Sequence, residues 1–207
     1  MSADLAGLPA FTPGPVELAG RHVRLVPLER DHLDGLCAAG ADDSLFRWLG
    51  DLRFSDRQRA SRHLDWSLAE AAAGRAVPFT ILLATDGTPV GQTQYLDLQA
   101  ADRGLEIGWT WIGRPWQRTP VNTECKRLLL GHAFDDLGAL RVQLKTDGRN
   151  AASRAAMERI GARYEGVLRN HRVLPDGSLR HSAYYSVIRE EWPAVRQHLD
   201  ELLARPA

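Results

Sequence analysis

Three consecutive segments that alternate polar and apolar residues constrain the fold of this chain most. The segments 79–83, 90–96 and 105–112 share a period of two, and no helical pattern interrupts them. Asp86-Gly87 lies between the first two segments and is a strong signal for a tight hairpin turn. We therefore predict three consecutive antiparallel strands, each of which places alternate side chains on opposite faces of one sheet.

Helical periodicity, capping residues and glycine stops predict the other elements. Asp31 and Ser55 are candidate N-caps of two helices that end near Gly40 and Gly74. The order of elements favours a mixed α+β class, with a mostly antiparallel twisted sheet of about six or seven strands and helices on both faces. The remaining predicted elements are strands at 22–26, 140–144, 167–173 and 179–188, and helices from Thr119-Pro120 to Gly138, from Asn150 to Ile160 and after Pro193.

Composition excludes several classes of protein. Hydrophobic residues make up 44% of the chain and charged residues 25%, which is typical of a globular protein and not of a disordered one. Lys plus Arg and Asp plus Glu are 26 each, so no net charge attracts nucleic acid or an anionic membrane. The longest apolar runs are far shorter than the roughly 18 residues of a membrane span. Cys37 and Cys125 are too few for a disulfide framework or a zinc site built on cysteines.

A chain of 207 residues suits one domain. Proline and glycine gather in residues 1–15, which we predict to be a flexible arm in front of a single domain at 16–207. The start shows no basic segment followed by an apolar one, as a secretion signal would. We therefore expect a cytoplasmic protein with no nucleic-acid or membrane partner, and the sequence leaves a homodimer open.

The segment 111–130 runs from a strand through a polar turn into a helix, and its turn suits an anion. Thr119 is a candidate N-cap, and Pro120 fits the first helical position. The N–H groups of the first turn and the positive helix end favour a pyrophosphate, and Arg114 and Arg118 add positive charge. Most helix N-termini bind nothing, so a purely structural turn is the more common alternative for this pattern taken alone.

Three segments taken together resemble one enzyme superfamily. They are 105–112 (LEIGWTWI), 115–124 (PWQRTPVNTE) and 149–153 (RNAAS), and their order and spacing are similar to those of the GNAT acetyltransferases, above all the RimJ/RimL branch of ribosomal-protein N-acetyltransferases. The resemblance extends over residues 23–193. It implies a GNAT fold and direct transfer of acetyl from acetyl-CoA to a primary amine in a ternary complex. The implied acceptor is a protein N-terminus, an amino acid or a small-molecule amine.

The resemblance also implies a set of cofactor-binding residues. The acyl-CoA loop of the family, Gln/Arg-x-x-Gly-x-Gly/Ala, falls on residues 117–122, where Gln117 matches and Pro120 and Asn122 replace the two small residues. Pro120 lacks an N–H that could hold a phosphate oxygen, and Asn122 adds bulk where phosphates should pass. Asn150 resembles the asparagine that contacts the pantetheine arm, although it also fits a simple helix N-cap. The implied cofactor-binding residues are Trp111, Ile112, Gln117, Arg118, Thr119, Val121, Asn122, Thr123, Asn150 and Ser153.

Two side chains are implied as catalytic, and each has a simpler interpretation. Glu106 matches a glutamate that RimJ/RimL-like proteins often carry on the central strand, where it would take the amine proton. Strand alternation points it away from the indoles of Trp109 and Trp111, and it could instead pair with a basic residue of a neighbouring strand. Ser153 falls near the thioester sulfur and could protonate the thiolate, because Met157 replaces the tyrosine acid of other members. It could also be a small packing residue.

The acceptor pocket of the family is bordered by a loop and a hairpin, which implies Trp48, Arg53, Tyr184 and Tyr185 as substrate contacts. Only one of the two tyrosines can face the pocket, because neighbours on a strand point in opposite directions. Cys125 lies on an apolar helix stripe, which favours a packed thiol over a nucleophile. The seven histidines show no metal-ligand spacing, so we predict no metal.

Two rival functions remain open at this point. One is a non-catalytic GNAT-like module that binds acyl-CoA or a peptide, and Pro120 and Asn122 are its best support. The other is a transferase that uses an acyl group other than acetyl. Replacing Glu106 by Gln separates the enzyme from the module, because a catalytic base can be removed without loss of cofactor binding.

Overall fold

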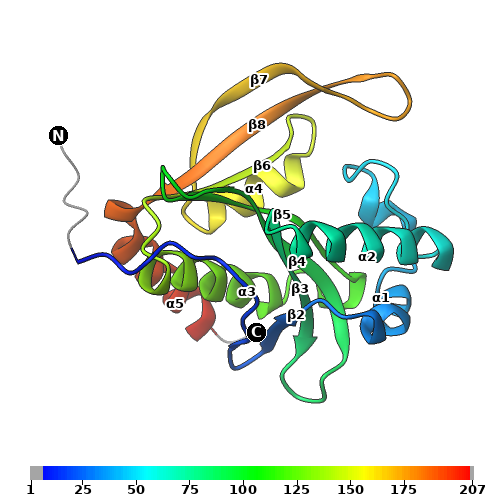
Figure 1. Ribbon diagram of the computed structural model, residues 1–207, viewed down its shortest axis with the longest axis horizontal. Helices are drawn as coiled ribbons and strands as arrows, with labels where there is room; N and C mark the ends of the chain where they lie inside the picture. The colour runs from blue at the N-terminus through cyan, green and yellow to red at the C-terminus, as the bar shows by residue number, and fades with distance from the viewer. Residues whose placement is uncertain (1–6, 206–207) are drawn as a thin grey trace.

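The computed structural model describes residues 7–205 as one mixed sheet with helices on both faces (Figure 1). The strands are β1 (Leu18–Ala19), β2 (Val23–Pro27), β3 (Ala76–Leu83), β4 (Pro89–Gln99), β5 (Gly104–Ile112), β6 (Arg141–Asp147), β7 (Arg163–Val173) and β8 (Leu179–Ile188). Their spatial order is β1-β2-β3-β4-β5-β6-β8-β7, and each neighbouring pair is antiparallel except β5 and β6. The predicted mixed class is therefore confirmed, with one strand more than expected.

Two layers of helices cover the central part of the sheet, whereas strand β7 at its edge is largely exposed. Helices α1 (Leu33–Ala39) and α2 (Arg57–Ala72) cover one face, and α3 (Pro120–Gly131), α4 (Ala151–Arg159) and α5 (Trp192–Ala204) cover the other (Figure 1). The larger core lies under α3, α4 and α5, and the smaller core lies under α1 and α2. None of the helices in residues 7–205 combines the length and apolar character that a bilayer crossing needs.

Some predicted boundaries differ from the observed ones for local reasons. The additional strand β1 has two residues, which is too short for a repeating pattern. Asp56, and not Ser55, caps α2, because its carboxylate accepts two backbone N–H groups of the first turn. A 3-10 turn precedes α1, so Asp31 lies inside that turn and not at the helix start. The third predicted helix does stop at Gly138, whose φ is 59°, but its last turn, His132–Asp136, is π-helical and not α-helical.

The parallel neighbours β5 and β6 pair over a short stretch and then separate. Gly104–Glu106 pairs with Arg141–Gln143, and within the described strands no pairing with β6 continues along residues 107–112. One edge of β5 is therefore open beyond Glu106, and the two strands enclose a wedge that we call the β5/β6 fork. Helix α3 follows β5 and helix α4 follows β6, so both helix N-termini lie at the open end of the fork.

A β-bulge in β5 changes the face that its indole side chains occupy. The register with β4 shifts at this point, and Trp109 has a φ of 51°. Leu105 packs in the larger core, whereas the ring of Trp111 lies 5.2 and 4.6 Å from two phenylalanine rings in the smaller core. Uniform alternation is therefore the wrong prediction for β5. The extra residue of the bulge puts Glu106 on the same face as the two indoles.

Part of the segment that the sequence predicts as a flexible arm lies against the body of the protein. Phe11 packs against the larger core, and the Arg103 guanidinium donates to the backbone carbonyl of Pro9. Residues 1–6, the first part of the predicted arm, lie outside the described residues. The boundary between arm and domain therefore stays a prediction, although residues 9–11 already contact the domain.

Candidate active site

Glu106 lies at the vertex of the β5/β6 fork, on the last residue of β5 that pairs with β6. Glu106 is 2% exposed, and its Oε2 accepts hydrogen bonds from Lys145 Nζ at 2.5 Å and from Gln143 Nε2 at 3.2 Å. Burial raises the pKa of Glu106, and the Lys145 ammonium opposes that rise. The simpler interpretation, an ion pair with a neighbouring strand, is therefore present. It is compatible with proton transfer, because it favours the ionised carboxylate.

Side chains of the loop between β5 and α3 fix that loop in place. Gln117 donates from Nε2 to the backbone carbonyl of Ile112 at 3.0 Å. Arg114 pairs with Asp42 at 2.8 Å, so its charge is already matched. Arg118 has an exposed side chain and a backbone φ of 61°, which turns the chain toward the helix. Of the two arginines predicted to face an anion, only Arg118 has no ion-pair partner among residues 7–205.

Helix α3 begins with the predicted cap. The Thr119 hydroxyl accepts the Val121 N–H at 3.4 Å, and a proline occupies the first helical position. Val121 and Thr123 are each 4% exposed, and the Thr123 hydroxyl accepts a hydrogen bond from an arginine of α4 at 3.0 Å. Asn122 is half-buried, and its side chain has no hydrogen bond within the described part of the chain. The side chains of Val121 and Thr123 are therefore buried in the protein, whereas that of Asn122 has no contact of this kind among residues 7–205 to hold it.

Helix α4 begins with Asn150 as its N-cap. Asn150 Oδ1 accepts the Ser153 N–H at 3.1 Å, and its Nδ2 donates to Thr146 Oγ1 at 3.1 Å. The cap interpretation is confirmed, and the contact with a pantetheine arm stays a prediction. Ser153 is half-buried in the first turn, with no hydroxyl hydrogen bond among the residues described. Met157 is 6% exposed and belongs to the larger core.

Tyr184 and Tyr185 point to opposite faces of β8, as strand alternation predicts. The ring centre of Tyr184 lies 5.7 Å from Lys145 Nζ, on the face that carries Glu106. Tyr185 is fully buried in the larger core, and its hydroxyl donates to Glu158 Oε1 at 2.8 Å. Tyr184 is therefore the tyrosine that shares a face with the carboxylate at the fork.

Trp48 and Arg53, between α1 and α2, have different surroundings. The guanidinium of Arg149 lies 5.3 Å from the ring centre of Trp48, and that of Arg47 lies 4.9 Å from it. Arg149 follows β6, so this contact connects the segment before α2 to the end of β6. Arg53 Nη1 donates to the carbonyl of Leu52 at 2.6 Å, so its guanidinium is used within its own loop.

Helix α3 also carries three consecutive buried residues with polar or titratable side chains, Glu124, Cys125 and Lys126. Cys125 is fully buried, and burial raises the pKa of its thiol, so the packed-thiol interpretation is confirmed. Lys126 is 6% exposed and donates to Thr110 Oγ1 at 2.8 Å, and burial lowers its pKa. Glu124 is 6% exposed and accepts three backbone N–H groups from the turn between β1 and β2. Neither charged residue can be recognised from the sequence as buried, because a helical stripe does not identify the partners of its polar side chains.

Further polar residues near the fork also escaped sequence reasoning. Lys145 is a polar position in a strand that alternates with buried apolar residues, and this alternation was the available signal. Gln92 Nε2, Gln94 Oε1 and Trp111 Nε1 are buried and have no hydrogen-bond partner among the described residues. Gln92 Oε1 lies 3.2 Å from His63 Nε2. Unpaired buried polar atoms are uncommon in native folds, and these lie on strands β4 and β5 beside the fork.

A profile described as "Acetyltransferase (GNAT) domain" matches residues 22–163. The chain belongs to the GNAT acetyltransferase family. A GCN5-related N-acetyltransferase from Brucella melitensis has a TM-score of 0.88 and 32% identity, over 96% of this chain and 90% of that one. RimJ of Mycobacterium smegmatis, solved in complex with CoA-disulfide, shares the GNAT fold with a TM-score of 0.76 and 23% identity, over 94% of this chain and 97% of that one.

A candidate ribosomal N-acetyltransferase of Bacillus subtilis (strain 168), YdaF, is 33% identical over 110 residues, which is 53% of this GNAT chain. The match spans 59% of YdaF. The expected resemblance to GNAT proteins of the RimJ-like branch is thus confirmed. Among residues 7–205, no three His, Cys, Asp or Glu side chains are grouped as metal ligands would be.

Proposed function

We propose that this protein transfers an acetyl group from acetyl-CoA to a primary amine while both substrates are bound. The β5/β6 fork carries this proposal, because it opens between the N-termini of α3 and α4 and has the Glu106 carboxylate at its vertex. The unpaired edge of β5 offers backbone N–H and C=O groups to the amides of pantetheine, and the first turn of α3 offers its positive end to the pyrophosphate.

The relatives support a cofactor and an acceptor class for this site. RimJ, which has the same fold, was solved with a disulfide form of CoA, and the name of YdaF assigns ribosomal N-acetylation. An amino group at a peptide N-terminus is accordingly the favoured acceptor. Asn122, Asn150 and Ser153 are the side chains near the two helix starts that we expect to contact the bound CoA.

The residues of the chain supply proton transfer and orientation in this proposal. An amine attacks a carbonyl only in its neutral form, so a base must first take a proton from the ammonium ion. Glu106, whose ionised form the Lys145 ammonium favours against burial, takes that proton directly or through one water molecule. Acetyl-CoA supplies the thioester, whose carbonyl carbon bonds to the nitrogen as the C–S bond breaks.

Two further groups complete the proposed step. Backbone N–H groups of β5 near Ile112 stabilise the oxyanion that forms on the carbonyl oxygen. The nitrogen loses its second proton as the amide forms, and the leaving thiolate gains one, so the step balances. Ser153, in the first turn of α4, relays that proton through its hydroxyl.

A thiol-release assay tests this proposal. The protein is incubated with acetyl-CoA and three acceptor classes: peptides with free N-termini, free amino acids and small amines. We expect thiol release that depends on the acceptor, together with an acetylated product identified by its mass. Glu106→Gln should retain acetyl-CoA binding and lose most of the turnover. The absence of acceptor-dependent thiol release with all three classes would contradict the transfer reaction.

A second candidate function is a non-catalytic module that binds acyl-CoA. It is favoured by Pro120, which removes one N–H from the first turn of α3, and by Asn122, which adds a side chain there. If the protein is such a module, it should bind CoA without turnover. A double substitution, Pro120→Gly with Asn122→Ala, should then increase acetyl-CoA affinity without producing turnover, and a calorimetric titration beside the thiol assay distinguishes the two functions.

A further inference from the structure

Two arginines face each other directly across the β7–β8 hairpin. Arg172 and Arg180 are register partners, so their side chains leave the same face of the hairpin at neighbouring positions. Like charges at directly opposed positions of an antiparallel pair are destabilising. Within residues 7–205, no carboxylate forms an ion pair with either guanidinium. The hairpin therefore holds two positive charges close together, and a bound anion would reduce their repulsion.

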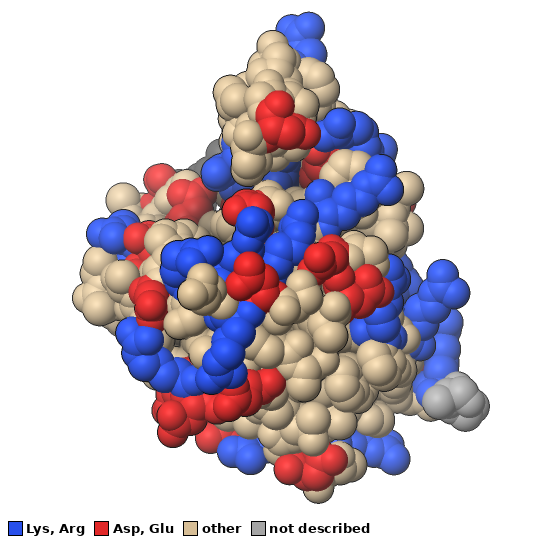
Figure 2. Space-filling view, turned by 90° about the vertical axis from the view of Figure 1, so that its right-hand side faces the viewer, with Lys and Arg blue, Asp and Glu red and all other residues tan. Residues whose placement is uncertain are grey.

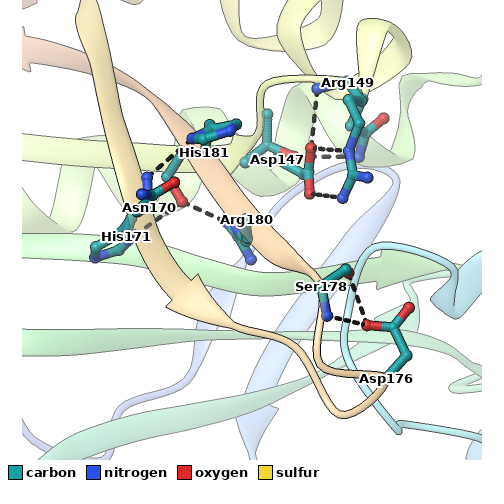
Figure 3. A network of polar contacts seen from close by, with 11 residues as sticks. Asp147, Arg149, Asn170, His171, Asp176, Ser178, Arg180 and His181 are labelled. Carbon is teal, nitrogen blue, oxygen red and sulfur yellow. Dashed lines mark hydrogen bonds and ion pairs between the residues drawn. The ribbon is translucent and has the colours of Figure 1, made fainter.

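The nearby carboxylates are already engaged with other cations. Asp147 is 2% exposed and accepts two hydrogen bonds from the Arg149 guanidinium, at 2.9 and 2.7 Å (Figure 3). Glu106 is paired with Lys145. Arg180 is half-buried and donates from Nε to Ser182 Oγ at 2.9 Å, which is its one side-chain hydrogen bond among the described residues. The outer nitrogens of Arg180 are therefore left for another partner.

The arginine pair lies on the face of the sheet that carries the proposed site. Arg180, Ser182 and Tyr184 alternate along β8, so they share one face, and Tyr184 contacts Lys145 beside Glu106. Figure 2 shows several basic side chains, with acidic ones among them, below the projecting hairpin. The hairpin thus extends from the fork to the two arginines on a single surface.

The imidazole of His171 reports the positive character of this surface. His171 lies 2.8 Å from Ser182 Oγ through Nδ1 and 3.3 Å from Tyr184 OH through Nε2. Its pKa is lowered by burial and by the charges of Arg172, Lys145 and Arg180. His181, which alternation puts on the opposite face, accepts the Asn170 N–H instead (Figure 3). Histidine protonation therefore adds to the excess of positive charge only at acidic pH.

We propose that Arg172 and Arg180 bind a carboxylate of the amine acceptor and thereby select acceptors that are acidic near the reacting amine. This inference rests on the proposed function of the fork. Ser182 and Tyr184 are two residues apart on β8, which corresponds to about 7 Å along the strand. The Arg180 side chain folds back and donates to Ser182, so its guanidinium lies about that far from Tyr184 along the strand. The carboxylate therefore lies about two residues along an extended acceptor from the amine, which indicates an acidic second or third residue of a peptide.

Peptide titrations test this proposal directly. Amidated tetrapeptides that differ only in Glu or Gln at the second or third position are titrated into the CoA-saturated protein, so that no transfer occurs. We expect at least one Glu peptide to bind roughly tenfold to a hundredfold more tightly than its Gln counterpart. Arg180→Gln and Arg172→Gln should each remove most of that preference. Arg169→Gln is the matched control, because Arg169 is an exposed arginine of the same hairpin with no such partner opposite it.

The controls separate this inference from the proposed function and from misfolding. Removing one of two opposed positive charges should leave the unfolding midpoint unchanged or raise it, which shows that the variants fold. Acetyl-CoA affinity should be the same in wild type and Arg180→Gln. A loss of acetyl-CoA affinity in that variant would assign the arginines to a phosphate of the cofactor and overturn the acceptor role. Equal binding of Glu and Gln peptides, including no detectable binding of either, would also overturn it.

Discussion

Two buried glutamates of this protein accept hydrogen bonds in different ways. Glu124 of α3 accepts the backbone N–H groups of Arg21, His22 and Val23, at 2.6 to 2.9 Å. Glu106 of β5 instead meets the side chains of Lys145 and Gln143. Backbone donors cannot move away from a carboxylate, whereas side-chain donors can change rotamer. The comparison indicates that Glu124 is an anchor that joins α3 to the β1–β2 turn, whereas the donors of Glu106 at the fork can move, as the proposed role of a base requires.

The largest expected effect is the loss of transfer in Glu106→Gln. Removal of a general base lowers the rate by roughly a hundredfold to ten-thousandfold. The value of kcat for a confirmed acceptor should fall by this factor, while the dissociation constant for acetyl-CoA stays within about twofold. An equal fall of kcat in Glu124→Gln and Glu106→Gln would contradict the different roles of the two glutamates.

Glu124→Ala should have the second-largest effect, and that effect concerns stability. Three backbone N–H groups lose their acceptor, which costs about 2–5 kcal/mol of unfolding free energy. At this chain length each kcal/mol lowers the unfolding midpoint by about 2–4 °C. Thermal unfolding measures the change, and Glu124→Gln should recover part of it because one acceptor oxygen remains. An unchanged unfolding midpoint in Glu124→Ala would contradict the claim that Glu124 anchors the β1–β2 turn to α3.

A smaller effect is expected on the pH profile of Lys145→Met. The Lys145 ammonium lowers the pKa of Glu106 against burial and the nearby Asp97 charge, so its removal raises that pKa further. A base acts only when ionised, so the acidic limb of kcat/KM should move to higher pH and activity should recover in alkaline buffer. Lys126→Met removes another buried lysine and should leave that limb in place. A profile that does not move in Lys145→Met contradicts the assignment of the limb to Glu106.

The smallest expected effect is that of Gln143→Leu. Gln143 Nε2 also donates to Asp97, at 2.9 Å, so only part of its hydrogen bonding serves Glu106. A neutral donor favours the ionised carboxylate less than an ammonium does. The acidic limb should therefore move in the same direction as in Lys145→Met but by a smaller amount. A larger shift in Gln143→Leu than in Lys145→Met would contradict the claim that Lys145 affects the pKa of Glu106 more than Gln143 does.

Local signals in the sequence predicted the elements that depend on neighbouring residues. The Asp86-Gly87 turn, the Thr119 cap of α3 and the Asn150 cap of α4 are recognisable because each needs one residue type at one backbone position. The GNAT family assignment came from the order of three such local segments. The roles of Glu106 and Ser153 remain predictions, because no observation of the fold alone measures proton transfer.

Features that depend on distant residues were not predictable from a single sequence. Glu106 and Lys145 are 39 residues apart, and their contact exists because β5 and β6 become parallel neighbours. The bulge at Trp109 shifts one strand by one residue, which a period of two does not reveal. The arginine pair of the second hairpin required its register, which depends on irregular pairing between Leu168 and Arg172.

Thermal unfolding with acetyl-CoA tests the central claim, that the β5/β6 fork is an acyl-CoA site, most directly. Ligand at about 100 times its dissociation constant stabilises a protein by about 2.7 kcal/mol. The unfolding midpoint should therefore rise by about 5–11 °C with acetyl-CoA. Glu106→Gln should show the same rise, and ATP should produce none. No rise in the wild type at millimolar acetyl-CoA would contradict the account.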